Sequence, residues 1–395
     1  MKIVIVGAGK VGVALTRHLA VENKVTVIDQ NPHLVENIIN IYDVMGVCGN
    51  GASYDVQKEA DVEQADLLIA TTSSDEINIL TCLVAKKMGV QHTIARIRSP
   101  EYGRQLRFMR SELGLSMAIN PEAATAREIA RVLRFPTAMK LESFSKGRLE
   151  LVEYRVAEHT ALDGTRLSEL YRNFKVRVLI CAVARQGETI IPSGDFTLRA
   201  GDKIYLTAAP RDLEKFFRLL GVFRARASSV MIVGASKMCY YLASELLEMG
   251  MSVKIIDQNE QRCVEMSERL PRALVIVGDG TDSELLSEEG ISQTDAFVAI
   301  TGLDEANILM ALSAAKQSGD CCKVVAKINR KSLLDLVSNE SMIDSVVSTG
   351  AVTTELILQY IRAMKNASAS KVKTLHRIVD EKVEALEFSV TPDIP

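Results

Sequence analysis

Short apolar runs and amphipathic stretches alternate along the first part of the chain. Lys2–Val6 and Lys24–Ile28 are rich in β-branched residues, which is typical of strands buried on both faces of a parallel sheet. Between these two runs, Val11, Leu15 and Leu19 recur at helical spacing. The pattern therefore predicts a strand, a helix and a second strand in succession.

The same alternation continues to about residue 135. We predict four further strands at Val44–Cys48, Asp66–Ala70, Thr93–Ile97 and Ser116–Ile119. We predict one helix over 32–41, a short helix capped by Ser53, and a third helix that ends near Met88. A fourth helix over 121–135 should lead away from the sheet. Strands that alternate with helices in this way indicate a Rossmann-like α/β unit, with a doubly wound parallel sheet.

From about residue 147 the pattern changes to that of a small α+β unit. The expected strands are Leu149–Val156, Val176–Arg185, Glu188–Pro192 and Lys203–Ala209, and the expected helices are Leu167–Phe174 and Arg211–Leu220. Most of these strands should pair in antiparallel fashion.

The order of elements then restarts near residue 226. Matching residues lie 227 to 229 positions apart, in the pairs Gly7 and Gly234, Asp29 and Asp257, Gly51 and Gly280, Thr72 and Thr301, and Asn78 and Asn307. Such an ordered series indicates an internal duplication. We therefore expect a first Rossmann-like unit at 1–137, a small unit at 138–225, a second Rossmann-like unit at 226–366 and a final segment at 367–395.

The final segment begins to repeat the small unit. Val383–Val390 resembles Leu149–Val156 at an offset of 234 residues. From the length of the repeat we expect a truncated second small unit that lacks roughly sixty residues.

A glycine-rich turn joins the first strand to the first helix. Gly7 permits the tight turn, Gly9 lets the backbone approach a pyrophosphate, and Gly12 lets the helix pack closely on the sheet. Asp29 ends the next strand, 22 residues after Gly7, where a carboxylate can accept hydrogen bonds from ribose hydroxyls. Because the carboxylate of Asp29 would repel a 2′-phosphate, we expect NAD(H) rather than NADP(H) as the ligand. The fingerprint that would bind it consists of Gly7, Ala8, Gly9, Lys10, Val11 and Gly12.

Four further loops should meet this turn at one edge of the sheet. The carboxyl ends of parallel strands lie together, and ligands bind there. The loops contain Asp29, Gly49–Gly51, Thr71–Ser74 and Arg98. Agreement among five loops makes a nucleotide site at this edge more specific than any single motif.

Composition and charge exclude several classes of protein. The net charge of −3 and the absence of a Lys/Arg tract argue against a nucleic-acid partner. No apolar run approaches the ~18 residues that span a bilayer. The seven cysteines show no C-x-x-C spacing and the five histidines are scattered. We therefore expect reduced, mostly buried thiols of a cytoplasmic protein, and neither disulfides nor a metal site.

Several motifs together resemble the TrkA family of potassium-uptake regulators. They are MKIVIVGAGKVG at 1–12 with Asp29, ATTSSDEIN at 70–78, ARIRSPEY at 95–102, GDGTD at 278–282 and TGLDEAN at 301–307. Members of this family are tandems of two RCK (KTN) units, each with a Rossmann-like TrkA-N domain and a small TrkA-C domain.

The resemblance implies a cytoplasmic protein, peripheral at the inner face of the membrane, that assembles as a tetrameric ring. It implies NAD(H), or ATP and ADP, as ligands, and a membrane K⁺-translocating subunit of the TrkH/TrkG type as partner. It places residues 7–11 on the pyrophosphate, Asp29 on the ribose, and Thr72, Ser73, Asn50 and Gly51 beside the cofactor.

Two positions of this implied site stay open. Arg98 would bridge to phosphate, or else it is a solvated or interface arginine. Asn50 departs from the acidic residue that is common in the family, and this bears on the contacts around adenine.

The second fingerprint is altered. It reads Gly234, Ala235, Ser236, Lys237, Met238 and Cys239. Ser236 narrows the room for a pyrophosphate, and Cys239 should hold the helix away from the strand. Asp257, Asp279 and Thr301 retain the acid and the two polar loops. We expect a weakened or altered nucleotide site here, with a purely structural unit as the alternative.

These features favour nucleotide-dependent gating of a K⁺ transporter or channel. The alternative, an NAD-dependent oxidoreductase, would need a proton donor or acceptor beside the nicotinamide. No His–Asp or Lys–Asp arrangement is visible in the small unit, so we expect no enzyme. A transcription factor that senses NADH would need a helix-turn-helix unit and a basic face, and the sequence shows neither.

Overall fold

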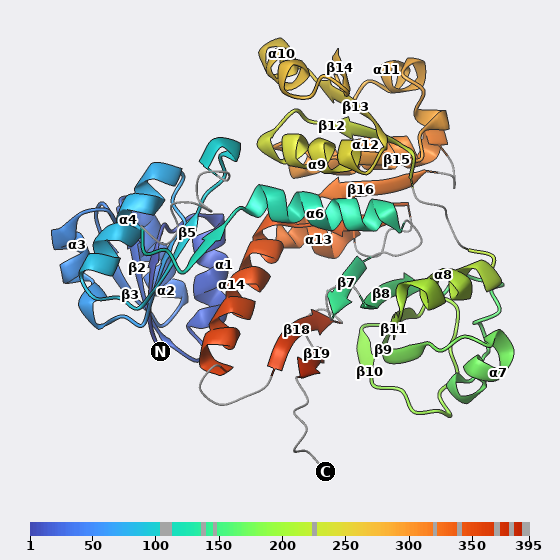
Figure 1. The fold of residues 1–395 in the computed structure, drawn as a ribbon, viewed down its shortest axis with the longest axis horizontal. Helices are drawn as coiled ribbons and strands as arrows, with labels where there is room; N and C mark the ends of the chain where they lie inside the picture. Colours follow the sequence, from blue (N-terminus) through green and yellow to red (C-terminus); the bar gives the residue numbers. More distant parts are fainter. Residues whose placement is uncertain are drawn as a thin grey trace.

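The computed structural model describes residues 1–102, 113–135, 140–144, 148–222, 227–318, 322–337, 342–366, 372–378 and 383–388. These residues form two six-stranded parallel sheets, one five-stranded antiparallel sheet and a two-stranded hairpin. Figure 1 shows the first parallel sheet in blue, the second in yellow to orange and the antiparallel sheet in green, with helices α6 and α14 lying between them.

The first parallel sheet has the strand order β3-β2-β1-β4-β5-β6. Its strands are β1 (Lys2–Val6), β2 (Lys24–Asp29), β3 (Met45–Cys48), β4 (Leu67–Ala70), β5 (His92–Arg96) and β6 (Met117–Ile119). They are connected through α1 (Lys10–Leu19), α2 (Pro32–Ile41), α3 (Tyr54–Glu59), the 3-10 turn η1 (Val62–Gln64) and α4 (Asp75–Lys87). The strand order reverses direction at β1, so the predicted doubly wound sheet is confirmed.

The second parallel sheet repeats the first in order and in register. Its order is β14-β13-β12-β15-β16-β17. Ile5 of β1 pairs with Val27 and Ile69, and Ile232 of β12 pairs with the matching residues Ile255 and Val298. The strands are β12 (Ser229–Val233), β13 (Ser252–Asp257), β14 (Leu274–Val277), β15 (Ala296–Ala299), β16 (Lys323–Lys327) and β17 (Ser345–Val347). The helices are α9 (Lys237–Glu248), α10 (Glu260–Arg269), α11 (Ser283–Glu288), η4 (Ile291–Gln293), α12 (Asp304–Ser318) and α13 (Lys331–Val337).

The small antiparallel sheet has the order β10-β9-β11-β8-β7. Its strands are β7 (Lys140–Phe144), β8 (Leu149–Arg155), β9 (Leu179–Arg185), β10 (Glu188–Ile190) and β11 (Lys203–Ala208), and its helices are η3 (Leu167–Glu169), α7 (Leu170–Phe174) and α8 (Pro210–Leu219). Phe216 and Phe217 of α8 are fully buried in its core. The sequence pattern missed β7, because this edge strand contains no β-branched residue and its adjacent polar residues Glu142 and Ser143 break the alternation of a strand.

The hairpin of β18 (Val372–Ile378) and β19 (Val383–Phe388) repeats the antiparallel pair β7–β8. Val383 and Ala385 pack with Leu151, Ala182 and Tyr205 of the small sheet. The last two residues of the Val383–Val390 match lie outside the described residues.

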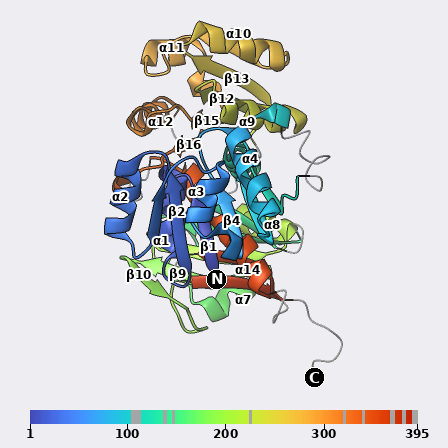
Figure 2. The ribbon, with the colours of Figure 1, turned by 90° about the vertical axis from the view of Figure 1, so that its left-hand side faces the viewer.

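Two long helices are exchanged between the parallel units. Helix α6 (Pro121–Arg134) follows the first sheet, but its Ile129 and Leu133 belong to the core of the second unit, together with Leu242 of α9. Helix α14 (Thr349–Asn366) follows the second sheet, but its Ile357 and Ile361 pack in the core of the first unit. Figure 1 shows α6 against the second unit and α14 against the first, and Figure 2 shows α14 beside the first unit from another side. The expectation that α6 leads away from its own sheet is therefore confirmed.

Ser53 precedes α3, but its side chain accepts no hydrogen bond from that helix, so the predicted side-chain cap is wrong. The described cysteines are free, and four of them are buried; Cys181 is partly exposed and Cys48 exposed, whereas Cys321 lies outside the described residues. Across the described part of the chain, no helix has the combination of length and apolarity that a bilayer crossing needs.

Because α6 packs in the core of the second unit, truncating a buried side chain of α6 should destabilise that unit. Ile129 has no exposed surface, so Ile129→Ala should lower the free energy of unfolding by about 2–5 kcal/mol. Urea unfolding followed by circular dichroism would measure this change. Ile41→Ala is the matched control, because Ile41 is 69% exposed and its truncation should cost less than about 0.5 kcal/mol. Equal unfolding curves for the two variants would contradict the assigned packing.

Candidate functional site

The carboxyl ends of β1 to β5 bring the five expected loops to one edge of the first sheet. The parallel pairing of β1 with β2 and β4, of β2 with β3 and of β4 with β5 requires this arrangement. The backbone N–H of Gly7 donates to Ile28 O at 2.8 Å, and that of Gly49 to Asp29 O at 2.9 Å. The turns that hold the candidate residues are thus tied to one another through the main chain.

The three fingerprint positions are occupied by glycine for different physical reasons. Gly7 has a φ of +106°, and a Cβ there would lie 2.9 Å from the backbone of Thr71 and Thr72. A Cβ on Gly12 would lie 1.8 Å from Gly7 O, so only glycine lets α1 approach the turn this closely. A Cβ on Gly9 would meet no atom within 4 Å. The fold therefore demands Gly7 and Gly12, whereas Gly9 leaves open space in front of α1.

The amino-terminal end of α1 is open to a ligand. Gly9 occupies the capping position and offers no side-chain acceptor. The first N–H groups of a helix have no acceptor within the helix, and the helix dipole favours an anion at this end. Lys10 begins the helix, and Val11 and Gly12 follow it as buried residues. This end of α1 has the form of an anion-binding site.

Asp29 holds the turn together as well as facing the site. Its carboxylate accepts hydrogen bonds from Ala8 N at 2.6 Å and from Asn31 N at 2.8 Å. In the second unit Asp257 accepts the same two bonds from Ala235 N and Asn259 N, at 2.7 and 2.8 Å. A carboxylate can accept further hydrogen bonds, so a contact with ribose stays compatible with this role. The bonds also explain why the acid is present in both copies.

The loop after β4 is held by a buried asparagine. Asn78 is fully buried, and its Oδ1 accepts from Thr72 N at 2.8 Å and from Thr72 Oγ1 at 2.7 Å. Its Nδ2 donates to Arg96 O at 2.8 Å. Asn307 makes the matching bonds to Thr301 N, Thr301 Oγ1 and Lys327 O. Thr72 and Thr301 therefore owe their positions to this anchor, and Ser73 follows Thr72 at the surface of the first unit.

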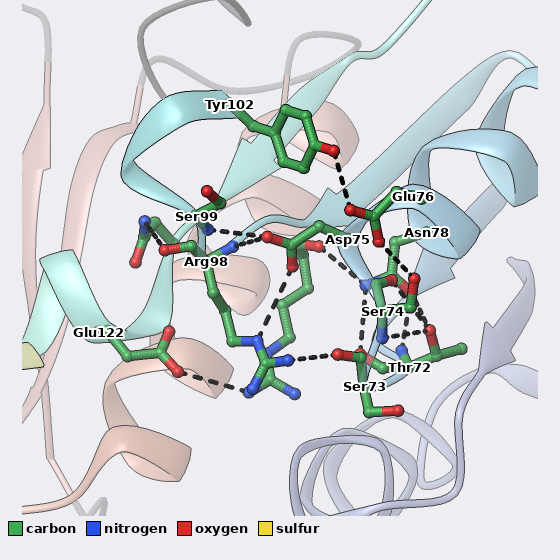
Figure 3. Close-up of polar contacts among 12 residues, drawn as sticks. Thr72, Ser73, Ser74, Asp75, Glu76, Asn78, Arg98, Ser99, Tyr102 and Glu122 are labelled. Atoms are coloured by element: carbon green, nitrogen blue, oxygen red, sulfur yellow. Dashed lines mark hydrogen bonds and ion pairs between the residues drawn. The ribbon is translucent and has the colours of Figure 1, made fainter. Parts of the chain in front are cut away.

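Arg98 is held on several sides, as Figure 3 shows. Its backbone N–H donates to Asp75 Oδ2 at 2.9 Å, and its guanidinium donates to Ser73 O. Its Nε lies 3.8 Å from Asp75 Oδ1. This places a partly exposed guanidinium beside the loop of Thr72 and Ser73. The position is compatible with a bridge to phosphate, and the contact of Tyr241 with Arg98 O also makes Arg98 an interface residue.

Two charged side chains beside this loop, Glu76 and Arg96, have pKa values below their ordinary ones. The hydroxyl of Ser74, aided by a hydrogen bond from Tyr102, lowers the pKa of Glu76 to about 2. Burial lowers the pKa of Arg96, whose guanidinium lies 3.7 Å from the carboxylate of Glu122. Nε of Arg96 is buried without a hydrogen-bond acceptor. This cation therefore retains one hydrogen-bond donor that the protein itself does not use.

The loop after β3 and the matching loop after β14 have the same turn hydrogen bond, although the first contains the amide Asn50 and the second the acid Asp279. Asn50 Oδ1 accepts from Ala52 N at 3.1 Å, and Asp279 Oδ1 accepts from Thr281 N at 2.8 Å. A Cβ on Gly51 would lie 2.1 Å from Val6 Cγ1. Gly51 is therefore explained by its packing on β1, and Asn50 retains the turn while carrying no charge.

The second fingerprint differs at its open end. Ser236 caps α9, and its hydroxyl accepts from Cys239 N at 3.4 Å. Cys239, which stands in the place of Gly12, is fully buried. Because a Cβ at Gly12 would lie 1.8 Å from the turn carbonyl, α9 must stand further from Gly234 than α1 stands from Gly7. Of its remaining fingerprint residues, Lys237 begins α9, while Met238 and Ala235 are buried.

The carboxyl edges of the two parallel sheets face each other closely enough for their charges to interact. Lys237 of the second fingerprint lowers the pKa of Glu76 in the first unit. Burial lowers the pKa of Lys327 at the end of β16; Asp304 and Glu122 raise it, and Lys10 of the first fingerprint lowers it further. Residues of both units thus shape the electrostatics of the first site.

The sequence interpretation missed Asp75 and Asn78 as the groups that position Arg98 and Thr72. A signal was present, because both residues recur in the second copy as Asp304 and Asn307. Asp304 accepts from two backbone N–H groups after β16, just as Asp75 does after β5.

Comparison with known proteins agrees with this architecture. The TrkA-N domain model matches residues 3–121 and again 230–349, and the TrkA-C domain model matches residues 151–221. The chain belongs to the TrkA family. The Trk system potassium uptake protein TrkA homolog of Archaeoglobus fulgidus is 33% identical, over 94% of this chain and 84% of its own length. The Trk system potassium uptake protein TrkA of Vibrio alginolyticus is 34% identical, over 98% of this chain and 84% of its own length.

Solved structures share the fold of this TrkA-family chain. The GsuK channel superposes with a TM-score of 0.69 at 21% identity, covering 93% of this chain and 64% of that one. The GsuK RCK domain gives a TM-score of 0.68 at 21% identity, covering 93% and 77%. The human SLO3 gating ring gives 0.54 at 13% identity, covering 93% and 84%. At these identities the comparison supports the tandem arrangement of the fold alone.

The glycine geometry predicts opposite outcomes for two alanine substitutions in this TrkA-family chain. Gly12→Ala places a methyl group against Gly7 O and should destabilise the first unit by about 1–3 kcal/mol. Gly9→Ala meets no atom and should cost less than about 1 kcal/mol, the scale of a helix-cap change. Thermal unfolding of both variants would measure this. A larger loss for Gly9→Ala than for Gly12→Ala would show that the turn is assigned wrongly.

Proposed function

We propose that this protein regulates K⁺ uptake by binding a nucleotide on its first Rossmann unit. The observation that carries the proposal is Gly9, whose missing side chain leaves room in front of an uncapped helix and has no role in the packing of the protein. The relatives that show the family are named Trk system potassium uptake proteins. Of the structural neighbours, one is described as the GsuK channel bound to NAD and another as GsuK bound to ADP.

The ligand that best fits the first site is NAD(H), with ATP and ADP as the competing candidates. The pyrophosphate would lie on Gly7, Ala8, Gly9, Lys10, Val11 and Gly12, at the amino-terminal end of α1. Asp29 would accept from the ribose, and Asn50 and Gly51 would lie near the adenine. Thr72 and Ser73 would lie beside the cofactor, and the guanidinium of Arg98 could exchange the Ser73 carbonyl for an oxygen of the pyrophosphate.

The second site would bind nucleotide weakly or not at all. Its candidate residues are Gly234, Ala235, Ser236, Lys237, Met238, Asp257, Asp279 and Thr301. The Ser236 hydroxyl already accepts from a helix N–H that a phosphate would need. Asp257 could still hold a ribose, as Asp29 would, but Asp279 would add a negative charge that Asn50 does not place beside the first site. We therefore expect one equivalent of nucleotide per chain.

The chain would act as a cytoplasmic subunit at the inner face of the membrane. Its units would be a first TrkA-N domain at 1–137, a TrkA-C domain at 138–225, a second TrkA-N domain at 226–366 and a final segment at 367–395. Four copies would form a ring on a K⁺-translocating membrane subunit of the TrkH/TrkG type. Helices α6 and α14 join the two Rossmann units, so a change between them would move the surface presented to that partner.

Regulation requires a difference in affinity between two arrangements of the units. A ligand shifts such an equilibrium only by the ratio of its affinities for the two states. NAD⁺ differs from NADH, and ATP from ADP, in charge and contacts near the glycine-rich turn and Arg98. The role that fits these features is regulatory rather than catalytic.

Gly9→Glu tests the site and the function together. The carboxylate would stand where the phosphates bind, while the Cβ meets no protein atom. We expect nucleotide affinity to fall at least ~100-fold, since repulsion replaces charge-assisted hydrogen bonds. Isothermal titration with NAD⁺, NADH, ATP and ADP would measure it, alongside K⁺ uptake in cells that depend on the system.

The matched control for Gly9→Glu is Ser236→Glu in the second fingerprint. It places the same charge at the matching position, and we expect it to leave the one equivalent of binding unchanged. Unchanged binding and uptake for Gly9→Glu would refute the proposed function. Two equivalents of similar affinity in the unmodified protein would refute the proposed weakness of the second site.

A further inference from the structure

A direct polar contact joins the loop of Arg98 to the second Rossmann unit. The hydroxyl of Tyr241 on α9 donates to Arg98 O at 3.0 Å. Nδ2 of Asn120 donates to the hydroxyl oxygen of Tyr241 at 2.8 Å and to Arg98 O at 3.3 Å. The three groups close a small ring of hydrogen bonds between residues of the two units.

Three polar groups of Arg98 are thereby engaged by other parts of the protein: its backbone N–H, its backbone carbonyl and one nitrogen of its guanidinium. Asp75 of α4 accepts its N–H, Ser73 accepts from its guanidinium, and Tyr241 and Asn120 donate to its carbonyl. Of these hydrogen-bond partners of Arg98, only the hydroxyl of Tyr241 belongs to the second unit. Motion of the Arg98 backbone would therefore break or shift a bond to α9.

The other two partners connect this contact to larger elements. Asn120 caps α6, the exchanged helix, because its Oδ1 accepts from Ala123 N at 2.8 Å. Tyr241 lies one turn beyond Lys237, the first residue of α9 and part of the second fingerprint. The contact thus links the first site to α6, to α9 and to the turn of the second site.

Within the described residues, this contact has no counterpart from α1 to the second unit. At the offset of 227 residues that relates Gly7 to Gly234, the residue matching Tyr241 is Ala14. An alanine has no side-chain donor, so α1 offers no such hydrogen bond to the loop after β16. A second link from the same loop, between Glu101 and Arg269 at 3.9 Å, joins two half-exposed or exposed side chains and should contribute little.

We propose that Tyr241 is a positioning residue of the first nucleotide site, and that occupancy of this site is communicated to the second Rossmann unit through its hydroxyl. The inference rests on the proposed function, because it requires a phosphate group within reach of Arg98. A phosphate that draws the guanidinium from Ser73 O moves the Arg98 backbone, and the hydroxyl carries that movement to α9. By linkage, the state of the second unit changes the affinity of the first site by the same factor.

Tyr241→Phe tests the proposal while retaining the ring and its packing. The measured quantity is the preference of the first site for ADP over adenosine, determined by titration with each ligand. Loss of the hydrogen bond should reduce this preference about three- to tenfold, the effect of one net hydrogen bond. Adenosine affinity should stay the same, because adenosine carries no phosphate to meet Arg98.

Hydrogen exchange gives an independent measurement of communication. In the unmodified protein, ADP should change the protection of the amides of α9, and in Tyr241→Phe this change should be lost. Tyr240→Phe is the matched control, because it removes the side-chain hydroxyl of the neighbouring residue on α9. Among the described residues this hydroxyl has no hydrogen bond, and the ring contacts Tyr241 and Arg269. The control should retain both the ligand preference and the exchange response.

A double variant shows whether the effect passes through Arg98. In the Arg98→Ala background, Tyr241→Phe should cause no further loss of the preference for ADP, since residues that act through each other are not additive. Additive losses would overturn the proposal, as would a Tyr241→Phe protein with unchanged preference and exchange response. Failure of the unmodified protein to bind ADP or NADH would instead overturn the proposed function, so the two failures are distinguishable.

Discussion

The exchange of α6 and α14 is the constraint on which the rest of the structure depends. Helix α6 follows the first sheet but places Ile129 in the core of the second unit. Helix α14 follows the second sheet but places Ile361 in the core of the first unit. Neither parallel sheet completes its apolar core without the partner's helix, because these side chains are buried almost entirely. The two units are thereby held with their carboxyl edges facing, and charges of one act on groups of the other. A ligand site at either edge is consequently also an interdomain site.

Comparison of the two copies separates what the fold needs from what a ligand needs. Asp257, Asn307 and Gly280 preserve the bonds or the close packing of Asp29, Asn78 and Gly51, and all of these serve the protein itself. Two fingerprint glycines changed: Gly12 is the buried Cys239, which requires a different approach of the helix to the turn, and Gly9, where the fold imposes no steric limit, is Ser236, which caps its own helix. A duplicated unit released from ligand binding can gain a helix cap, which stabilises helices by about 1 kcal/mol. The retained acid is therefore no evidence that the second unit binds a ribose.

Much of the fold could be predicted from the sequence, because local pattern and tertiary structure agree in buried parallel strands. Lys2–Val6 was predicted and observed with the same bounds, and the duplication made each assignment in one unit a check on the other. The site was predictable as far as backbone requirements reach, for example at Gly7 and Gly12. What the sequence could not supply were contacts between units. Nothing in the pattern around Tyr241 relates it to Arg98, 143 residues earlier, and the partners of α6 and α14 follow from packing that no local period encodes.

The facing edges also give a physical reason why an anionic ligand should alter the arrangement of the units. Lys10 and Lys327 come from different units and repel each other, and burial already disfavours the charge of Lys327. Arg96 is partly buried with one nitrogen that has no acceptor, and the carboxylates of Glu122, at 3.7 Å, and Asp75 balance its charge. Removing charges from water is costly unless opposite charge compensates them. An anion on the end of α1 would lower this cost only while both edges stay close, so its binding energy depends on the relation between the units. A neutral ligand of the same shape would lack that dependence, which makes the phosphate groups, rather than the adenine or the ribose, the part of a nucleotide able to act on the arrangement.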